Sequence, residues 1–238
     1  MKKALPAILA FTALPLPAAT LFSSDFNGTT GVPNSGFAIN SSGSATAGVT
    51  WGVQNASVTS ISSTLSALSP DGGFFIRGSI STVNNIWVNS NLNRLQAGGT
   101  GNGDLRERGY SLTFALNTPW DLKNLRVIAG HTASDGNDQA FLSDLSISLS
   151  GGTLGAEVTQ TKSQIDYTNT GPAFLTQDFD LTGTTLGAGT YTLDVYMNNL
   201  TGGGAFATFD GITLEAVPEP STALLGALGM LVLLRRRR

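Results

Sequence analysis

The stretch Tyr110-Ser111-Leu112-Thr113-Phe114-Ala115-Leu116 alternates large apolar residues with small ones over seven positions. Successive side chains of a β-strand point to opposite faces, so this period of two predicts a strand with one face in a core. The alternation returns at Leu125 to Ala129, Leu145 to Leu149, Tyr191 to Met197 and Ile212 to Ala216. The chain therefore repeats one kind of half-buried strand.

Three further runs, Val49 to Val53, Phe74 to Ile80 and Ile86 to Leu92, predict additional strands by their content of β-branched and aromatic residues. Gly, Asn, Asp and Pro separate the runs, and no long amphipathic helix is evident that could connect parallel strands. The pattern predicts an all-β fold, an antiparallel β-sandwich and most economically a jelly roll. We expect the polar residues around Leu145 and Ile147 to face water: Asp144, Ser146 and Ser148.

The N-terminus has the pattern of a cleavable secretory signal. Met1-Lys2-Lys3 is positive, Ala4 to Leu16 is apolar but too short to span a bilayer, and the small residues Ala18-Ala19-Thr20 follow. We expect cleavage near Ala19 or Thr20. This divides the protein into a signal peptide (residues 1–20), a β-sandwich domain (21–217) and a C-terminal tail (218–238).

The charge of the middle domain argues against nucleic acid as a partner. Residues 21–217 hold seven basic and fifteen acidic side chains, a net charge of −8, and show no basic cluster. Phosphate binding depends on Lys and Arg that neutralise charge. Cys is absent, so the protein has neither a disulfide framework nor a thiol nucleophile.

The C-terminal tail joins three different segments. Val217-Pro218-Glu219-Pro220 is a rigid polar motif, Ala223 to Leu234 is an apolar run expected to form a short helix, and Arg235-Arg236-Arg237-Arg238 is a basic stop. From Ser221 to Leu234 the uncharged segment has 14 residues, short of the roughly 20 that span a bilayer comfortably. Arginines can hold such a helix end at the cytoplasmic headgroups. A transient anchor is the favoured interpretation, and a permanent one stays open.

These three segments, in this order, closely resemble the PEP-CTERM sorting signal of exported bacterial proteins. The resemblance implies export through the inner membrane of a Gram-negative bacterium that makes extracellular polysaccharide. It also implies recognition by an exosortase-type membrane peptidase, with cleavage at or near Pro218-Glu219-Pro220. More loosely, Phe114 to Thr153, with Trp120-Asp121-Leu122 and Ile128-Ala129-Gly130-His131, is similar to galactose-binding-like jelly rolls found before such tails. That second resemblance assigns no ligand residues.

Two groups of acidic residues raise the question of calcium, which prefers oxygen ligands. Asp135, Asn137 and Asp138 are closely spaced, but their spacing departs from the EF-hand loop and fits an ordinary turn. Asp25 and Asp210 lie near the two ends of the domain, and the first and last strands of a jelly roll commonly neighbour each other. These two carboxylates could hold a structural calcium ion, although two ordinary turns or bulges are the favoured interpretation, and no other cofactor is expected.

Aromatic residues are candidates for stacking on sugars. The set comprises Trp51, Trp87, Trp120, Tyr110, Tyr167 and Tyr196. Most tryptophans of a sandwich belong to its core. Trp87 lies between Ile86 and Val88 in a predicted strand and points to the opposite face from both. It is the best of the three tryptophans for an exposed, sugar-stacking position, although either face of the strand could be the buried one in a two-sheet core.

A catalytic centre is not expected. His131 is the only histidine and is predicted to lie in a surface loop between two strands. The carboxylates that glycoside hydrolysis would need, Glu107, Glu157 and Glu215, have no recognisable context. We therefore expect a non-catalytic structural or adhesive protein of the cell surface or extracellular polysaccharide matrix. The alternative is a carbohydrate-binding module with a defined sugar site.

Overall fold

The computed structural model describes residues 17–26, 46–68, 74–77, 94–97, 108–133, 141–167, 175–198 and 205–219. Every regular element in these ranges is a β-strand: β1 (Ala19–Ser24), β2 (Thr46–Gly48), β3 (Val53–Gln54), β4 (Val58–Ile61), β5 (Thr64–Ala67), β6 (Phe74–Arg77), β7 (Arg94–Ala97), β8 (Arg108–Leu116), β9 (Trp120–Ala133), β10 (Phe141–Gly151), β11 (Val158–Tyr167), β12 (Leu175–Asp180), β13 (Thr185–Leu186), β14 (Gly189–Asn198) and β15 (Ala205–Pro218).

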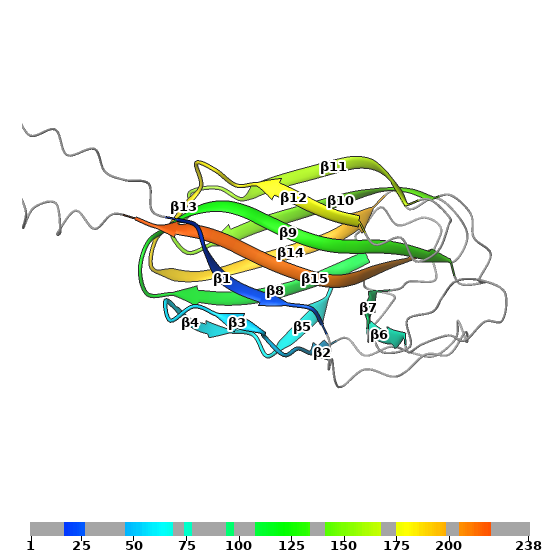
Figure 1. Cartoon of the computed structure of the whole chain (residues 1–238), viewed down its shortest axis with the longest axis horizontal. Helices are drawn as coiled ribbons and strands as arrows, with labels where there is room; N and C mark the ends of the chain where they lie inside the picture. Colours follow the sequence, from blue (N-terminus) through cyan, green and yellow to red (C-terminus); the bar gives the residue numbers. More distant parts are fainter. Residues whose placement is uncertain are drawn as a thin grey trace, which may run out of the picture.

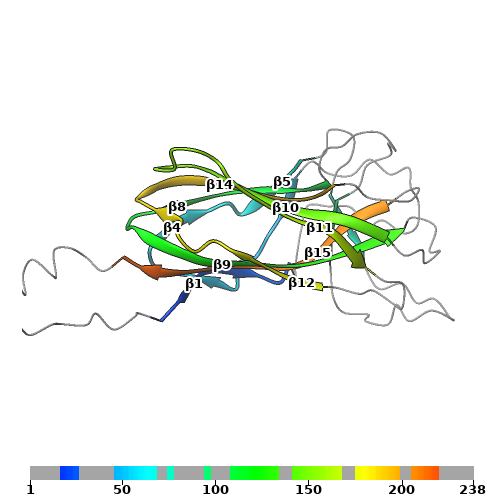
Figure 2. The same ribbon diagram turned by 90° about the horizontal axis from the view of Figure 1, so that it is seen from above.

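The strands form two antiparallel sheets that pack face to face. Sheet A has the order β12-β9-β15-β1-β3, with β13 beside β9 and with β7 and β6 attached to β15. Sheet B has the order β11-β10-β14-β8-β5-β2, with β4 beside β8. Figure 2 shows the two layers from the side, with β9, β1 and β15 in one and β14, β8 and β10 in the other. The predicted sandwich is confirmed: β8, β10, β11 and β14 belong to sheet B, and β9, β12 and β15 belong to sheet A.

The alternating runs of the sequence coincide with the strands that enclose the core. Apolar residues from β8, β9, β10, β14 and β15 are buried at every second position: Tyr110, Leu112, Phe114, Leu116, Leu125, Val127, Ala129, Leu145, Ile147, Leu149, Tyr191, Leu193, Val195, Met197, Ile212, Leu214 and Ala216. Each large side chain removed from water in this way contributes roughly 1.5–3 kcal/mol.

Aromatic rings connect the two sheets through the core. Phe22 of β1 lies edge-to-face with Phe114 of β8, with their centroids 5.1 Å apart. Tyr110 of β8 contacts Phe209 of β15 at 4.9 Å and Phe26 at 5.5 Å, both edge-to-face. Such pairs add stabilisation beyond the buried area alone. Strand β1 therefore packs against β8, from the middle of the sequence, and also pairs with β15, the last strand.

Two of the less regular runs differ from prediction. Residues 49–53 do not form one strand, because β2 ends at Gly48 and β3 begins at Val53. Trp51 lies between these strands, and its indole Nε1 donates to the backbone oxygen of Ser62 at 2.8 Å. The run predicted from Phe74 to Ile80 is a strand over Phe74–Arg77. The run from residue 86 to 92 lies outside the described residues.

The serines of β10 also differ from prediction. Ser146 and Ser148 are 2% and 5% exposed, although they are on the face of sheet B away from the core. Strand β10 lies between β11 and β14, so both serines have a neighbouring strand on each side. Ser146 shares a 2.9 Å hydrogen bond with Thr161, and Ser148 donates to Glu157. Sequence alternation identifies the face of a strand, whereas its burial depends on the neighbouring strands.

Both ends of the described domain emerge at one end of the sandwich. Strand β1 pairs antiparallel with β15, and Ala19 lies opposite Ala216. The start of β1 and the end of β15 are side by side in Figure 1. We call this end the terminal pole; it also carries the turns at residues 55–57, 117–119, 151–157 and 181–188. Ala19 and Thr20, where signal cleavage is predicted, are thus strand residues, and the domain boundaries stay predictions.

Among the residues that the structure describes, no helix is long and apolar enough to cross a bilayer. The apolar run at 223–234, the predicted C-terminal helix, lies outside them, as do residues 1–16 of the predicted signal peptide.

Candidate functional site

The sorting motif begins inside the last strand of the sandwich. Val217 pairs with Asp121 and Pro218 pairs with Trp120, so both residues are part of the ladder between β15 and β9. The next residue, Glu219, is exposed, and its N–H donates to the backbone oxygen of Pro119 at 3.4 Å. The folded domain and the motif therefore adjoin directly. Pro220 and the basic stop at 235–238 lie outside the described residues.

A hydrogen-bond network stabilises the turns of the terminal pole. The Tyr191 hydroxyl donates to the backbone oxygen of Gly187 at 2.9 Å and lies 3.0 Å from the hydroxyl oxygen of Thr153. Thr153 in turn accepts the Gly187 N–H at 2.9 Å. Since Thr153 follows β10 and Gly187 precedes β14, this network ties two turns to the buried end of Tyr191.

Trp120 is part of the core at the same pole. Its side chain is 4% exposed, and its indole Nε1 donates to the hydroxyl of Thr118 at 3.2 Å. Trp51 is also packed against the core, with its ring 5.3 Å from that of Phe22. Trp120 is therefore buried, whereas Trp51 is partly buried. Trp87 lies outside the described residues and stays a prediction.

Tyr196 is the aromatic candidate that the structure places on the outer face of sheet B. It alternates along β14 with the buried Val195 and Met197 and is itself half-buried. It lies between Ser146 of β10 and Gly109 of β8 in the sheet. A Cβ on Gly109 would lie 2.7 Å from the Cβ of Tyr196, so the tyrosine approaches the sheet closely at this glycine.

A row of neutral and acidic side chains crosses sheet B beside Tyr196. Asp194 lies between Ser148 and Ser111 on the neighbouring strands, and one of its carboxylate oxygens is buried without a hydrogen-bond partner among the described residues. We call this surface the polar face and define it by one residue or two from each of four strands: Thr159, Thr161, Ser146, Ser148, Asp194, Tyr196 and Ser111. The sequence had suggested Tyr196 only as one of six aromatic candidates.

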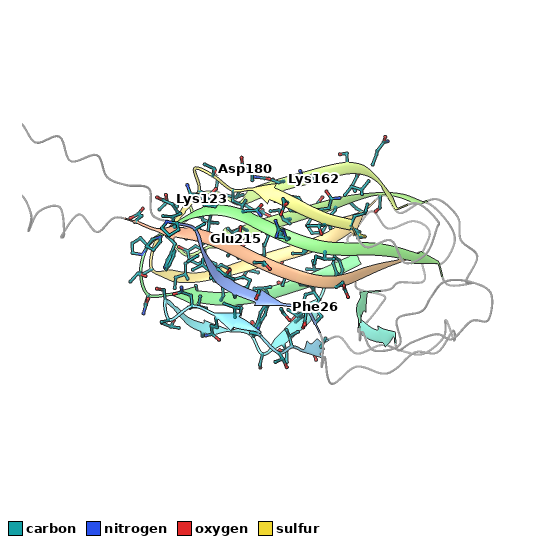
Figure 3. All side chains as sticks on the ribbon, in the orientation of Figure 1. Phe26, Lys123, Lys162, Asp180 and Glu215 are labelled. Atoms are coloured by element: carbon teal, nitrogen blue, oxygen red, sulfur yellow. The ribbon has the colours of Figure 1, made fainter. Side chains whose placement is uncertain are left out.

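The outer face of sheet A differs from the polar face by its charge. Arg126 and Asp178 form an exposed ion pair with Nε and Oδ1 2.9 Å apart, and Asn124 donates to the same oxygen at 2.9 Å. These two hydrogen bonds, with that from Arg126 the stronger influence, hold the pKa of Asp178 below its usual range. Figure 3 labels Lys123 and Glu215 on strands of sheet A, and Lys162 on β11 of sheet B.

The predicted calcium ligands lie close to the end of the ladder between β1 and β15. Ser24, the last residue of β1, pairs with Ile212; Asp25 directly follows Ser24, and Asp210 of β15 lies two residues before Ile212. Phe26, labelled in Figure 3, has a φ of 54°, which marks a tight turn directly after Asp25. The described residues contain no group of three acidic or histidine side chains that could hold a metal. Calcium at the Asp25–Asp210 pair stays a prediction; Asp135, Asn137 and Asp138 lie outside the described residues.

The catalytic candidates of the sequence are on separate elements. His131 lies in β9 and pairs with Ala207, so the prediction of a loop at this position is wrong; β9 simply continues to Ala133. Glu157 precedes β11 in sheet B, whereas Glu215 belongs to β15 in sheet A. Glu107 lies outside the described residues. The described strands therefore do not bring these carboxylates together as a pair.

Residues 216–238 match the PEP-CTERM protein-sorting motif. The protein is thus an exported β-sandwich protein with a C-terminal sorting signal, and an exosortase-type peptidase is the kind of partner that processes it. Among solved structures, TmCBM61 in complex with β-1,4-galactotriose is similar with a TM-score of 0.35 and 10% identity, over 68% of this protein and 90% of that one. No curated protein matches the sequence.

Proposed function

We propose that this is a non-catalytic structural or adhesive protein of the cell envelope or extracellular polysaccharide matrix of a Gram-negative bacterium. In this role its tail anchors it transiently in the inner membrane before an exosortase-type peptidase releases it to the surface. The observation that carries the proposal is the direct junction of sorting motif and sandwich, since β15 ends at Pro218. The sandwich is therefore the part that sorting delivers.

The separation of the catalytic candidates supports a non-catalytic role. Glycosidases place two carboxyl groups about 5–10 Å apart on either side of the scissile bond. In this protein Glu157 accepts a hydrogen bond from Ser148 on sheet B, while Glu215 lies on sheet A. Each of these carboxylates is part of the surface of its own sheet.

The polar face favours a second candidate function, a carbohydrate-binding module with a defined sugar site. An aromatic ring can stack on the apolar face of a pyranose, and neighbouring carboxylates and hydroxyls can bind its hydroxyl groups. Tyr196 provides the ring, and Asp194 with Ser111 provides polar groups in the adjacent row. Trp87 is the second aromatic candidate for the same role.

Glycan binding by the processed protein, purified from its host, distinguishes the two functions. We expect retention on a gel of the host's exopolysaccharide in either case, and saturable binding to a defined glycan only for a module. In that case Tyr196→Ala or Trp87→Ala abolishes saturable binding, whereas Val53→Ala, a change at an exposed residue of sheet A, leaves it intact. If the protein were not retained on exopolysaccharide and bound no glycan, both proposed functions would be contradicted.

A further inference from the structure

We propose that the polar face binds a neutral glycan chain, one without carboxylate or sulfate groups, along the line of strand β14. Asp194 and Asn198 accept hydrogen bonds from hydroxyl groups of the chain, and the ring of Tyr196 stacks on one of its sugars. This inference rests on the second candidate function, the carbohydrate-binding module. It adds the chemical class of the glycan and the direction of the chain on the sheet.

Three residues form a line on the outer face of sheet B. Asp194 and Tyr196 belong to the polar face, and Asn198 follows them on the same side of β14. They alternate with Val195 and Met197, whose side chains are in the core. At a rise of about 3.3 Å per residue, the line from Asp194 to Asn198 is about 13 Å long. This length exceeds one sugar ring, so the line suits a chain of several sugars rather than a monosaccharide.

Two acceptor oxygens on this line lack a hydrogen bond. The Oδ1 atoms of Asp194 and Asn198 are both buried, and neither has a partner within the described part of the chain. A buried acceptor without a donor is unfavourable, and carboxylate and amide oxygens can only accept. A ligand that supplies hydroxyl donors relieves this cost toward both ends of the line.

Tyr196 controls access to these oxygens. Because both atoms are buried, a ligand reaches them only when a neighbouring side chain turns aside. Tyr196 is two positions from each on the same face and is half-buried. Side chains at a protein surface change rotamer rapidly. In the proposed complex the ring turns toward the sugar, and this movement opens the way to both oxygens.

The cross-strand neighbours of the line are small. Ser148 and Ser111 lie on either side of Asp194, and Ser146 and Gly109 lie on either side of Tyr196. Serine hydroxyls can accept as well as donate, so they pair readily with sugar hydroxyls. At these positions no large side chain of the adjoining strands stands beside the line. A chain parallel to β14 therefore has hydroxyl groups within its reach.

The basic residues of sheet B are not on this face. The described strands of the sheet contain two, Arg108 and Lys162. Lys162 pairs with the buried Leu145, and its Nζ is 5.9 Å from the ring centre of Phe179 in the other sheet. Arg108 pairs with Met197, a position of β14 on the core side. Neither basic residue therefore has its register position on the outer face.

The outer face has carboxylates instead. Asp194 is in the line itself, and Asp144 pairs with Asn198. Glu157 is exposed and accepts a hydrogen bond from Ser148. A glycan with carboxylate or sulfate groups would meet these negative charges without a cation on the described part of the face to balance them. A neutral chain avoids this repulsion and still supplies the hydroxyl donors.

Matched oligosaccharides test the class of glycan. The processed protein, purified from its host, is titrated calorimetrically with neutral oligomers of glucose, galactose or mannose. It is also titrated with uronate oligomers, with the same uronates after chemical reduction of their carboxyl groups to alcohols, and with glucosamine oligomers. We expect saturable binding to a neutral or reduced chain, and about tenfold or more weaker binding to the corresponding uronate, because like charges repel. This binding should change little up to roughly 0.5 M salt, since screening acts on charge pairs.

The outcomes separate the glycan class from the proposed function. Uronates that bind as tightly as their reduced forms overturn the inference and leave the carbohydrate-binding module in place. Binding of glucosamine oligomers alone, lost in high salt, does the same. Absence of saturable binding to every probe contradicts the module itself and the inference with it.

Removal of the central acceptor tests the position of the site. Asp194→Ala should weaken binding of the neutral chain by about tenfold or more, because a hydrogen bond to a charged group is lost. Asp178→Ala, a matched change on the outer face of sheet A, should leave binding unchanged. Circular dichroism checks that both variants are folded. Unchanged binding by folded Asp194→Ala overturns the inference.

An added positive charge tests the selection against anionic chains without disturbing the line. Ser66 is exposed and pairs with Ser111, so it is in the same cross-strand row as Asp194. Ser66→Lys should strengthen binding of a uronate oligomer by about threefold or more relative to the neutral chain. Val53→Lys adds the same charge at an exposed residue of sheet A and should not. Equal effects of the two lysines overturn the assignment to the polar face.

Discussion

Removal of one buried hydroxyl group should stabilise this protein. The Tyr110 hydroxyl is fully buried between the sheets and has no hydrogen-bond partner among the described residues. Burial also raises the pKa of Tyr110, since an ionised phenolate would be still less favourable there. An unsatisfied buried polar group costs about 1–3 kcal/mol relative to water. The change Tyr110→Phe removes this cost and keeps the ring contacts with Phe26 and Phe209.

We expect Tyr110→Phe to raise the free energy of unfolding by about 1 kcal/mol. For a domain of this size, such a change raises Tm by about 2–4 °C. The matched control is Tyr191→Phe, which removes the same group from a hydroxyl that bonds Gly187 and Thr153. There we expect a loss of about 1–3 kcal/mol, because the partners at Thr153 and Gly187 lose their hydrogen bonds.

Thermal and urea unfolding of the processed protein, followed by circular dichroism, measures both variants under one set of conditions. The sign of the change in the free energy of unfolding distinguishes a hydroxyl without a partner from a bonded one. The comparison is direct because both substitutions are Tyr→Phe and both side chains are buried. If Tyr110→Phe lowered stability as much as Tyr191→Phe, the Tyr110 hydroxyl would have a partner in the folded state. The reasoning from its unsatisfied burial would then be refuted.

Three further predictions concern the calcium candidates, the surface of sheet A and the packing of sheet B. If Asp25 and Asp210 hold calcium, a chelator lowers the Tm of the wild type but not that of Asp210→Asn, and an unchanged wild-type Tm ends the idea. The pKa of Asp178 is lowered by Arg126 and Asn124, so its stabilising effect is complete above the usual aspartate pKa and is lost as pH falls through the lower folded-state value. Asp178→Asn should therefore cost at most about 1 kcal/mol at pH 7 and progressively less as pH falls through the folded-state pKa, and a cost that does not change with pH would contradict the ion-pair explanation. Gly109→Ala should destabilise by more than about 2 kcal/mol, because its Cβ would overlap the backbone oxygen of Val195. Gly155→Ala, with open space around its Cβ, should be nearly neutral in the same unfolding measurement.

Local alternation predicted the strands that carry the core, because each side chain of a strand has a fixed face. Tyr110 to Leu116 and Tyr191 to Met197 were identified in this way, and both runs point their apolar residues inward. His131 was misplaced because the polar residues after it resemble a loop, whereas strand pairing with β15 extends β9 to Ala133. Pairing is a property of the neighbouring strand and leaves no signal in the local sequence.

The sorting tail could be recognised from sequence alone, since its three segments are contiguous and their order is the signal. Because the three segments are adjacent in the sequence, the sorting signal could be recognised without the tertiary structure. The polar face, in contrast, combines residues from β8, β10, β11 and β14, and only the register of these strands places Tyr196 between Ser146 and Gly109.

The sequence by itself therefore predicted an all-β protein and showed the C-terminal sorting signal of an exported protein. Only the tertiary structure decided that Val217 and Pro218 are paired on the terminal pole, beside the start of β1. The physical reason is that the hydrogen bonds which protect a backbone segment come from strands distant in sequence. The motif is recognised from its contiguous residues, whereas the pairing of Val217 and Pro218 depends on β9.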